Sequence, residues 1–153
     1  MNDGNRIVAE AAAATALEAW RAWGALVLAR AALREQPDVA PKLPRAAREA
    51  LHHVLKPSGN GEREGARVGS LAAVEEELAR AAAALDGLER CPIRALAKRH
   101  GLSRRERDVL GFLAVHALCQ PFAALCDALD LEGIDGEDVQ VGFLIEALFP
   151  DAA

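Results

Sequence analysis

The feature that most constrains this fold is a pair of narrow apolar stripes with helical spacing. Apolar side chains recur three and four residues apart at Leu71, Val74, Leu78, Ala81 and Leu85. A comparable stripe nearer the N-terminus comprises Leu17, Trp20, Trp23 and Val27. Such spacing puts each stripe on one face of a helix, and two such faces bury each other when their helices lie side by side. We therefore predict two long antiparallel helices, one over 7–35 and one from the N-cap Ser70 to about Gly87.

Prolines and glycines divide the rest of the N-terminal half. Pro37 ends the first helix, and a second helix begins near Pro44 and ends before Pro57. Its spacing predicts an inward face of Ala47, Leu51, Val54 and Leu55. The following stretch, PSGNGEREGARVGS, is rich in glycine and charge and predicts a flexible linker. We divide the chain into a two-helix arm at 1–56, a linker at 57–69, and a helical unit at 70–153 that packs with the arm as one domain.

The C-terminal part begins with a helix, a tight turn and a second helix. The short helix IRALAKRH follows Pro92 and ends at Gly101. Ser103 and Glu106 then have the spacing of a capping box, which marks the start of a helix. The apolar spacing of this second helix predicts that it buries Val109, Leu110, Leu113 and Ala117.

Two more helices complete the C-terminal part. One begins at Pro121, and its predicted inward face comprises Phe122, Leu125, Cys126 and Leu129. The segment VQVGF is predicted as a short extended piece or wing before a last helix at 143–149. We therefore predict a mainly α fold, in which a helical bundle arm is followed by a winged-helix-like, tri-helical unit with at most a minimal wing.

Composition and cysteine usage indicate the class of protein. Just over half of the residues, 52%, are hydrophobic, so the chain can bury a core. Cys91, Cys119 and Cys126 lack C-x-x-C spacing, which predicts small buried thiols rather than a disulfide framework or zinc site. Neither a signal-peptide pattern nor an uncharged span of roughly 20 residues is present. We therefore predict a cytoplasmic protein that does not enter a membrane.

The stretch LSRRERDVLGFLA, which begins at Leu102, resembles the opening of the DNA-binding helix-turn-helix of quorum-sensing regulators. A recognition helix must present polar or cationic side chains to DNA. The candidate here, FAALCDAL, carries Asp127, and no lysine or arginine follows Cys119. The same region holds Asp127, Asp130, Glu132, Asp135, Glu137, Asp138, Glu146 and Asp151. Nucleic-acid binding is therefore disfavoured, and a winged-helix DNA-binding regulator stays as the alternative function.

The sequence gives little support to an enzyme. His116 lies three residues before Cys119, so a nucleophilic pair is conceivable, but no orienting or oxyanion-stabilising group accompanies it. The run IDGED lacks the ligand alternation of a calcium loop, and the chain has no G-x-x-x-x-G-K-[ST] motif. We therefore predict a non-enzymatic chain with no catalytic residue, no cofactor and no metal ligand.

A longer resemblance covers about residues 92–149. PIRALAKRHGLSRRERDVLGFLAVHAL, PFAALCDAL and VQVGFLIEALF are similar, in order and spacing, to the winged-helix-like N-terminal domain that precedes the motor in a group of bacterial AAA+ ATPases. That group includes ATPases associated with contractile injection systems. The agreement lies at Pro92, Leu96, Ala97, Gly101, Leu102, Ser103, Glu106, Leu110, Leu113, Val141, Gly142, Phe143 and Leu148.

Two departures from the family pattern bear on function. VHALCQPF replaces the acidic "pELD" step of the family, and the sequence ends at DAA, where the family continues into Walker motifs. The chain would then be a truncated form or a stand-alone relative, and ATP hydrolysis would belong to the missing part.

The resemblance implies an adaptor domain that docks a protein partner, either an AAA+ motor or a component of a secretion apparatus. The residues we expect to contact such a partner are a basic cluster and an exposed indole, drawn from Lys98, Arg99, Arg104, Arg105, Arg107, Trp20 and Trp23. Most of the tryptophan surface is expected in the core. A second alternative is a self-assembling helical subunit, in which the stripes of the two long helices pair between chains.

Overall fold

The computed structural model describes residues 3–36, 43–55, 70–88 and 90–152, apart from the side chains of residues 5, 7–13 and 152. The mainly α fold class is confirmed, because seven α-helices make up most of this part. The predicted linker at 57–69 lies outside the described residues. The helices are α1 Asp3–Glu35, α2 Arg45–Leu55, α4 Leu71–Asp86, α5 Pro92–Arg99, α6 Arg104–Leu118, α7 Gln120–Leu129 and α8 Val141–Leu148, followed by a short 3-10 turn, Pro150–Ala152.

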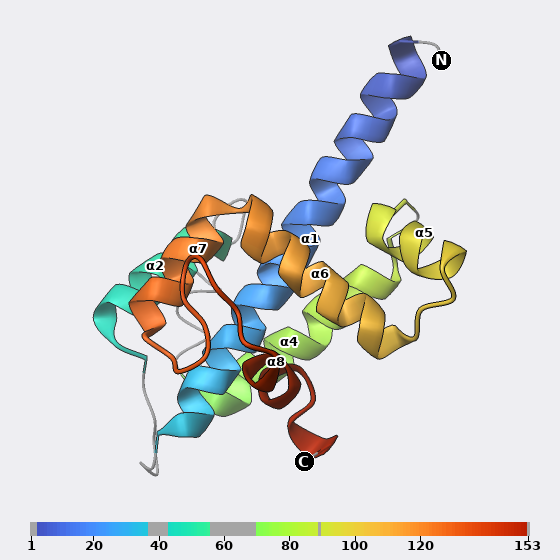
Figure 1. Cartoon of the computed structure of the whole chain (residues 1–153). Coiled ribbons are helices and arrows are strands. Elements are labelled where there is room, and N and C mark those ends of the chain that lie inside the picture. Colours follow the sequence, from blue (N-terminus) through green and yellow to red (C-terminus); the bar gives the residue numbers. More distant parts are fainter. Residues whose placement is uncertain (1–2, 37–42, 56–69, 89, 153) are drawn as a thin grey trace.

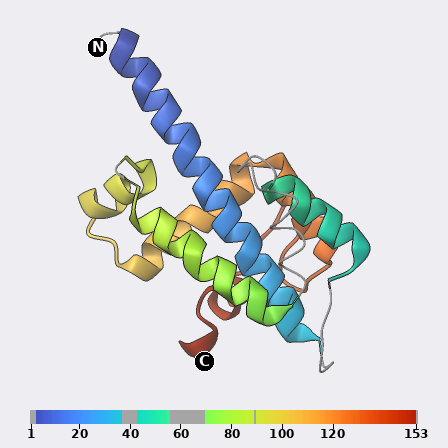
Figure 2. The same ribbon diagram turned by 180° about the vertical axis from the view of Figure 1, so that it is seen from behind.

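The long helix α1 is the spine of the molecule. It contacts α2, α4, α6, α7 and α8, and its first turns project beyond the other helices (Figures 1 and 2). From Ala16 onward its residues enter the hydrophobic core. The shorter helices are therefore arranged around the C-terminal half of α1.

The predicted antiparallel pairing of the two long helices is confirmed for α1 and α4. Figure 2 shows α4 lying along α1, and the predicted stripe of α4 is buried at Val74, Leu78 and Leu85. An ion pair of 2.8 Å joins Arg34, in the last turn of α1, to Glu75, in the first part of α4. The stripe of α4, which the self-assembling alternative pairs between chains, is thus covered by α1 of the same chain.

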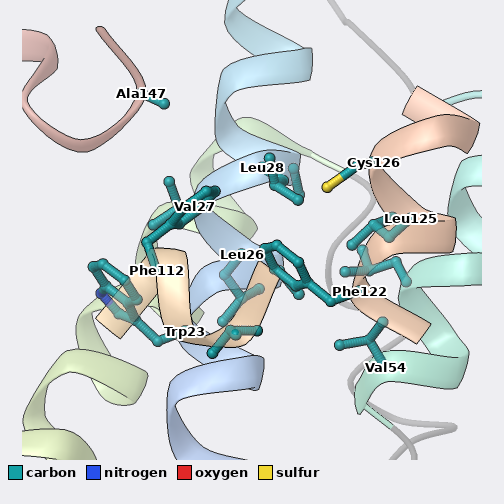
Figure 3. Packing of buried hydrophobic residues seen from close by; sticks show 14 of the residues in the cluster. Trp23, Leu26, Val27, Leu28, Val54, Phe112, Phe122, Leu125, Cys126 and Ala147 are labelled. Atoms are coloured by element: carbon teal, nitrogen blue, oxygen red, sulfur yellow. The ribbon is translucent and has the colours of Figure 1, made fainter. Parts of the chain in front are cut away.

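The inward faces predicted for the second helix and for the helix after Pro121 are also confirmed. All four predicted residues of α2 and all four of α7 are buried. The two helices pack on each other, and Figure 3 shows Val54 of α2 near Leu125 of α7. Together they close one side of the core.

The contact between α1 and α6 is a large side chain against a glycine. Trp20 is only 1% exposed, and its ring lies directly over Gly111 of α6. A Cβ atom added at Gly111 would lie closer than 3.0 Å to three carbons of that ring, a distance that real Cβ atoms essentially never show. No other residue type at 111 therefore leaves room for the indole.

A second glycine contact joins α1 to α7. A Cβ added at Gly24 would come within 3.0 Å of Phe122 of α7. Phe122 in turn meets Phe112 of α6 edge to face, with ring centroids 5.4 Å apart, a favourable aromatic geometry. Figure 3 shows both phenylalanines beside α1, together with Leu26 and Val27. Large rings set against glycines thus bring three helices into close contact.

The prediction for the buried face of α6 was wrong at two positions. Leu113 is 38% exposed and Ala117 is exposed, while Val109 and Leu110 are only partly buried. The buried residues are instead Gly111, Phe112 and Val115. From Val109 onward this helix is apolar on nearly all sides, so periodicity alone does not select its inner face. The fit of Trp20 against Gly111 does.

The expected extended segment VQVGF is reduced to a single residue pair. Val139 forms an isolated antiparallel bridge with Ile134, the only β pairing among the described residues. The backbone N–H of Gln140 donates to the carbonyl oxygen of Gly133 (2.8 Å), and α8 then begins at Val141, two residues earlier than predicted. Gly133 has a φ of 92°, which glycine adopts without strain.

We expect Gly111→Ala to lower the free energy of unfolding by about 1–3 kcal/mol, because its methyl group would force Trp20 and α6 apart. The matched control is Gly142→Ala in α8, where an added Cβ meets nothing within 4 Å. That change should raise stability slightly, since alanine favours a helix. Urea denaturation measures both, and equal stabilities for the two variants would contradict the contact.

Candidate interaction surface

The helix–turn–helix of α5 and α6 has the local geometry that its sequence predicts. Pro92 occupies the first turn of α5. The helix ends in a left-handed Gly101 with a φ of 63°, and the N–H of Leu102 donates back to the carbonyl oxygen of Ala97 (2.8 Å). This arrangement is a Schellman turn, in which glycine is favoured. It delivers the chain directly to the start of α6.

The predicted capping box at the start of α6 is confirmed. The N–H of Glu106 donates to the Ser103 hydroxyl (3.2 Å), and the N–H of Ser103 donates to the Glu106 carboxylate (2.6 Å). The Ser103 backbone N–H, and after it the Ser103 hydroxyl, favour the ionised carboxylate of Glu106 and lower its pKa. Ser103 and Glu106 therefore have a structural role.

α5 is fastened to the end of α4 by Arg94. The Arg94 guanidinium donates to the carbonyl oxygens of Leu88 (2.6 Å) and Leu85. A cation at these carbonyls satisfies acceptors that the end of a helix leaves free. The position of α5 relative to α4 is therefore fixed by a charged group as well as by packing.

Two of the five predicted basic contact residues are engaged within the chain. Asp86, at the end of α4, accepts from Arg104 (2.9 Å) and from Arg107 (3.3 Å). Arg107 also pairs with Asp108 (3.0 Å) and lies 5.8 Å from the centre of the Trp20 ring. Burial raises the pKa of Asp108, and the neighbouring Arg107 opposes that rise. Arg107 is therefore a structural cation, and Arg104 is partly neutralised.

The other three cations remain on the surface. Arg105 lies over the ring of Phe149, with its guanidinium carbon 5.3 Å from the ring centroid. Lys98 and Arg99, in the last turn of α5, are exposed and form no ion pair with any described residue. Leu96 lies three residues before Arg99, on the same side of α5, and is 43% exposed. One of these cations, Arg99, thus shares a side of α5 with an exposed leucine.

The two tryptophans are core residues, as mainly expected, and their burial gives no support to either of them as a partner contact. Trp20 and Trp23 meet edge to face, with ring centroids 5.3 Å apart, and both are buried. The Trp20 indole N–H donates to the sulfur of Cys91 (3.3 Å). Their large apolar rings fill the space between α1 and the helices around it, which leaves no indole surface for docking.

The candidate nucleophilic pair is not assembled. The Nε2 atom of His116 lies 2.7 Å from the carbonyl oxygen of Asp135, and Cys119 is buried at the corner between α6 and α7. All three cysteines are free and buried, as predicted. Burial raises the pKa of the Cys126 thiol to about 12, which keeps it protonated. Within the described residues, no group of three or more His, Cys, Asp or Glu side chains could hold a metal ion.

Sequence reasoning missed the partners of the arginines and the exposed aliphatic residues. Asp86 is far from Arg104 in sequence, so no local pattern indicates their pairing. Exposure of Leu113 conflicts with the periodicity that assigned it to the core. No inner face was predicted for α5, so the exposure of Leu96 was not anticipated. The one available signal for the inner face of α6 was Gly111. A glycine inside an apolar stretch of helix often marks a close approach by another element.

Comparisons of this chain with protein-family models, with curated proteins and with solved structures found no match. Of the helices that the structure describes, none is alone long and apolar enough to cross a membrane. Only α6 and α7 taken together reach that length and composition, and they are bent by 98°.

The capping box gives a pH-dependent prediction for Glu106→Gln. The pKa of Glu106 is lower in the folded state than in the unfolded state, so its ionised form stabilises folding above the unfolded pKa. This contribution is lost as the pH falls through the folded pKa. The wild type should therefore be the more stable protein at neutral pH. The difference should shrink as the pH falls below the unfolded pKa, about 4.3, and vanish once the pH is below the folded pKa. Urea denaturation over a pH series measures it, and a difference independent of pH would contradict the role of the charge.

Proposed function

We propose that this chain is a non-catalytic protein-docking domain of the kind that precedes the motor of a bacterial AAA+ ATPase. Its contact area would be the α5–α6 surface, defined as Leu96, Lys98, Arg99 and Arg105. The partner would present an acidic segment and would belong to the motor or to the secretion apparatus that the motor serves. We propose a cytoplasmic location for this chain as well.

The observation that carries this proposal is the exposed Leu96 on the same side of α5 as Arg99. Lys98 is the next residue along the chain, and no described carboxylate neutralises either cation. Single exposed leucines are common on protein surfaces. Here the leucine lies on a helix that Arg94 attaches to the end of α4, and the charges of its last turn have one sign. An apolar anchor with a charged rim is the usual composition of a protein contact.

The AAA+ part of the proposal rests on the resemblance over residues 92–149. α5, α6 and α7 follow one another in the order of the resembling blocks, and the isolated Ile134–Val139 bridge lies between α7 and α8 in the chain. We interpret this arrangement as a winged-helix-like unit with a minimal wing. The motor itself would supply ATP hydrolysis.

The DNA-binding alternative receives less support from the same residues. α7, the candidate recognition helix, has its apolar face buried against α1 and α2, and its exposed positions include Asp127. Arg104 and Arg107 of α6 are held by Asp86. Duplex DNA would therefore meet few free cations and many carboxylates.

The test is a charge reversal on the α5–α6 surface. The tagged chain and its Lys98→Glu/Arg99→Glu variant are used to capture partners from the native cell, and the captured proteins are identified by mass spectrometry. We expect the wild type to retain a Walker-motif ATPase or a secretion-apparatus component. The variant should lose it at least tenfold, because the reversed charges repel an acidic segment.

The matched control, Arg45→Glu/Arg48→Glu, makes the same charge change on the exposed side of α2 and should retain the partner. Capture of neither kind of protein by the wild type, or equal capture by both variants, would overturn the proposal. An electrophoretic shift at low salt that the α5–α6 reversal abolishes would favour the DNA-binding regulator. Concentration-dependent light scattering without a partner would favour the self-assembling subunit.

A further inference from the structure

Helix α8 carries an apolar face that points away from the core. Val141 and Ile145 are 71% and 53% exposed, and they lie four residues apart on one side of the helix. The opposite side is buried at Phe143, Leu144 and Ala147. Two large aliphatic side chains exposed together on an ordered helix are more typical of a contact surface than a single one is.

This helix is held firmly at both ends. At its start, the N–H of Gln140 donates to the carbonyl oxygen of Gly133. Near its end, the Arg30 side chain donates to the carbonyl oxygen of Ala147 (2.8 Å), and burial lowers the pKa of that half-buried arginine. A surface that is already ordered before binding loses little conformational entropy when a partner docks.

Three exposed carboxylates flank the exposed face along the chain. Glu137 and Asp138 precede α8 by one turn, Glu146 follows Ile145, and all three are exposed. The Asp135 carboxylate accepts the N–H groups of Glu137 and Asp138 (2.7 Å each), which fixes the backbone of the turn that carries them. Together with Val141 and Ile145, these three carboxylates are the α8 face.

No cation of the described chain neutralises these carboxylates. Among the described residues, no ion pair involves an acidic residue after Leu118, and the sequence from Cys119 onward has no lysine or arginine. Two arginines lie near the other end of α8: Arg30 donates to the carbonyl oxygen of Ala147, and Arg105 lies over Phe149. The α8 face therefore combines an apolar centre with unpaired negative charge.

We propose that the α8 face is a second docking site, which binds a cationic amphipathic helix of a protein partner. Aliphatic side chains of that helix would cover Val141 and Ile145, and its lysine or arginine side chains would pair with the bordering carboxylates. Gly142 adjoins both aliphatic residues, and the space above it is open, which allows close approach of the partner. The site uses no residue of the α5–α6 surface and has the opposite charge, so the two surfaces select different partners.

The test is fluorescence anisotropy with a labelled peptide helix of about five turns, made of leucine on one face and lysine on the other. Two control peptides have glutamate in place of every lysine, or the same composition in an order without an apolar face. We expect the chain to bind the first peptide only. Higher salt should weaken that binding, because the rim contacts are ionic.

The variant Ile145→Glu distinguishes docking of the peptide at the α8 face from general electrostatic attraction of a cationic peptide to an acidic protein. It adds a negative charge but removes an apolar anchor, so we expect affinity for the cationic peptide to fall about tenfold or more. Gly142→Gln should also weaken binding, by filling the open space, without lowering stability. The control Leu96→Glu changes an exposed leucine on the α5–α6 surface and should bind as the wild type does.

Binding that Ile145→Glu leaves unchanged or strengthens would overturn the proposal, and so would equal binding of the peptide without an apolar face. Sedimentation of the chain alone gives a further outcome. Self-association that Ile145→Glu abolishes would assign the α8 face to a second copy of this chain instead. Flotation with lipid vesicles that requires Ile145 would assign it to a membrane surface.

Discussion

The packing of Trp20 on Gly111 is the contact on which the rest of this structure depends. It brings the spine helix α1 against α6 and fixes the rotation of α6 about its own axis. Phe112 and Val115 then face the core, and Arg107, one turn before Gly111, lies beside the same indole. Because Arg107 also binds Asp86 at the end of α4, one tryptophan connects the core to the arrangement of the surface charges.

Helices with one apolar face were predicted well from sequence. α2 and α7 each have a polar side and an apolar side, so periodicity identified all of their buried residues. Local motifs were equally informative, because the capping box and the glycine turn depend on neighbouring residues only. These features need no knowledge of the tertiary structure.

The orientation of α6 required tertiary information. Leu110 and Leu113 form one plausible apolar face, and Phe112 and Val115 form another. The choice between the two faces depends on Trp20, which is far away in sequence. Its large ring fits only against a residue without a Cβ atom, and Gly111 is that residue. The same limit explains why Trp20 was considered for docking. A tryptophan side chain is a large apolar ring with one polar N–H group, so it suits a core and an interface equally. Only its place in the folded chain shows which of the two it occupies.

The charges of the C-terminal half divide it into two surfaces with different chemistry. Lys98 and Arg99 on α5 are free cations, and the carboxylates around α8 are free anions. Each region also exposes aliphatic side chains that the core does not use, Leu96 on one and Ile145 on the other. A chain with this arrangement is suited to hold two different protein partners, and we propose that role for it.

The most direct test of this account is the accessibility of the two faces of α6 to a thiol reagent. The native cysteines are buried, so the unmodified protein gives a slow baseline. We predict that Leu113→Cys reacts at close to the rate of an exposed thiol, whereas Val115→Cys stays near the baseline. Faster labelling of Val115→Cys than of Leu113→Cys would mean that α6 is rotated the other way, and would contradict the Trp20–Gly111 contact.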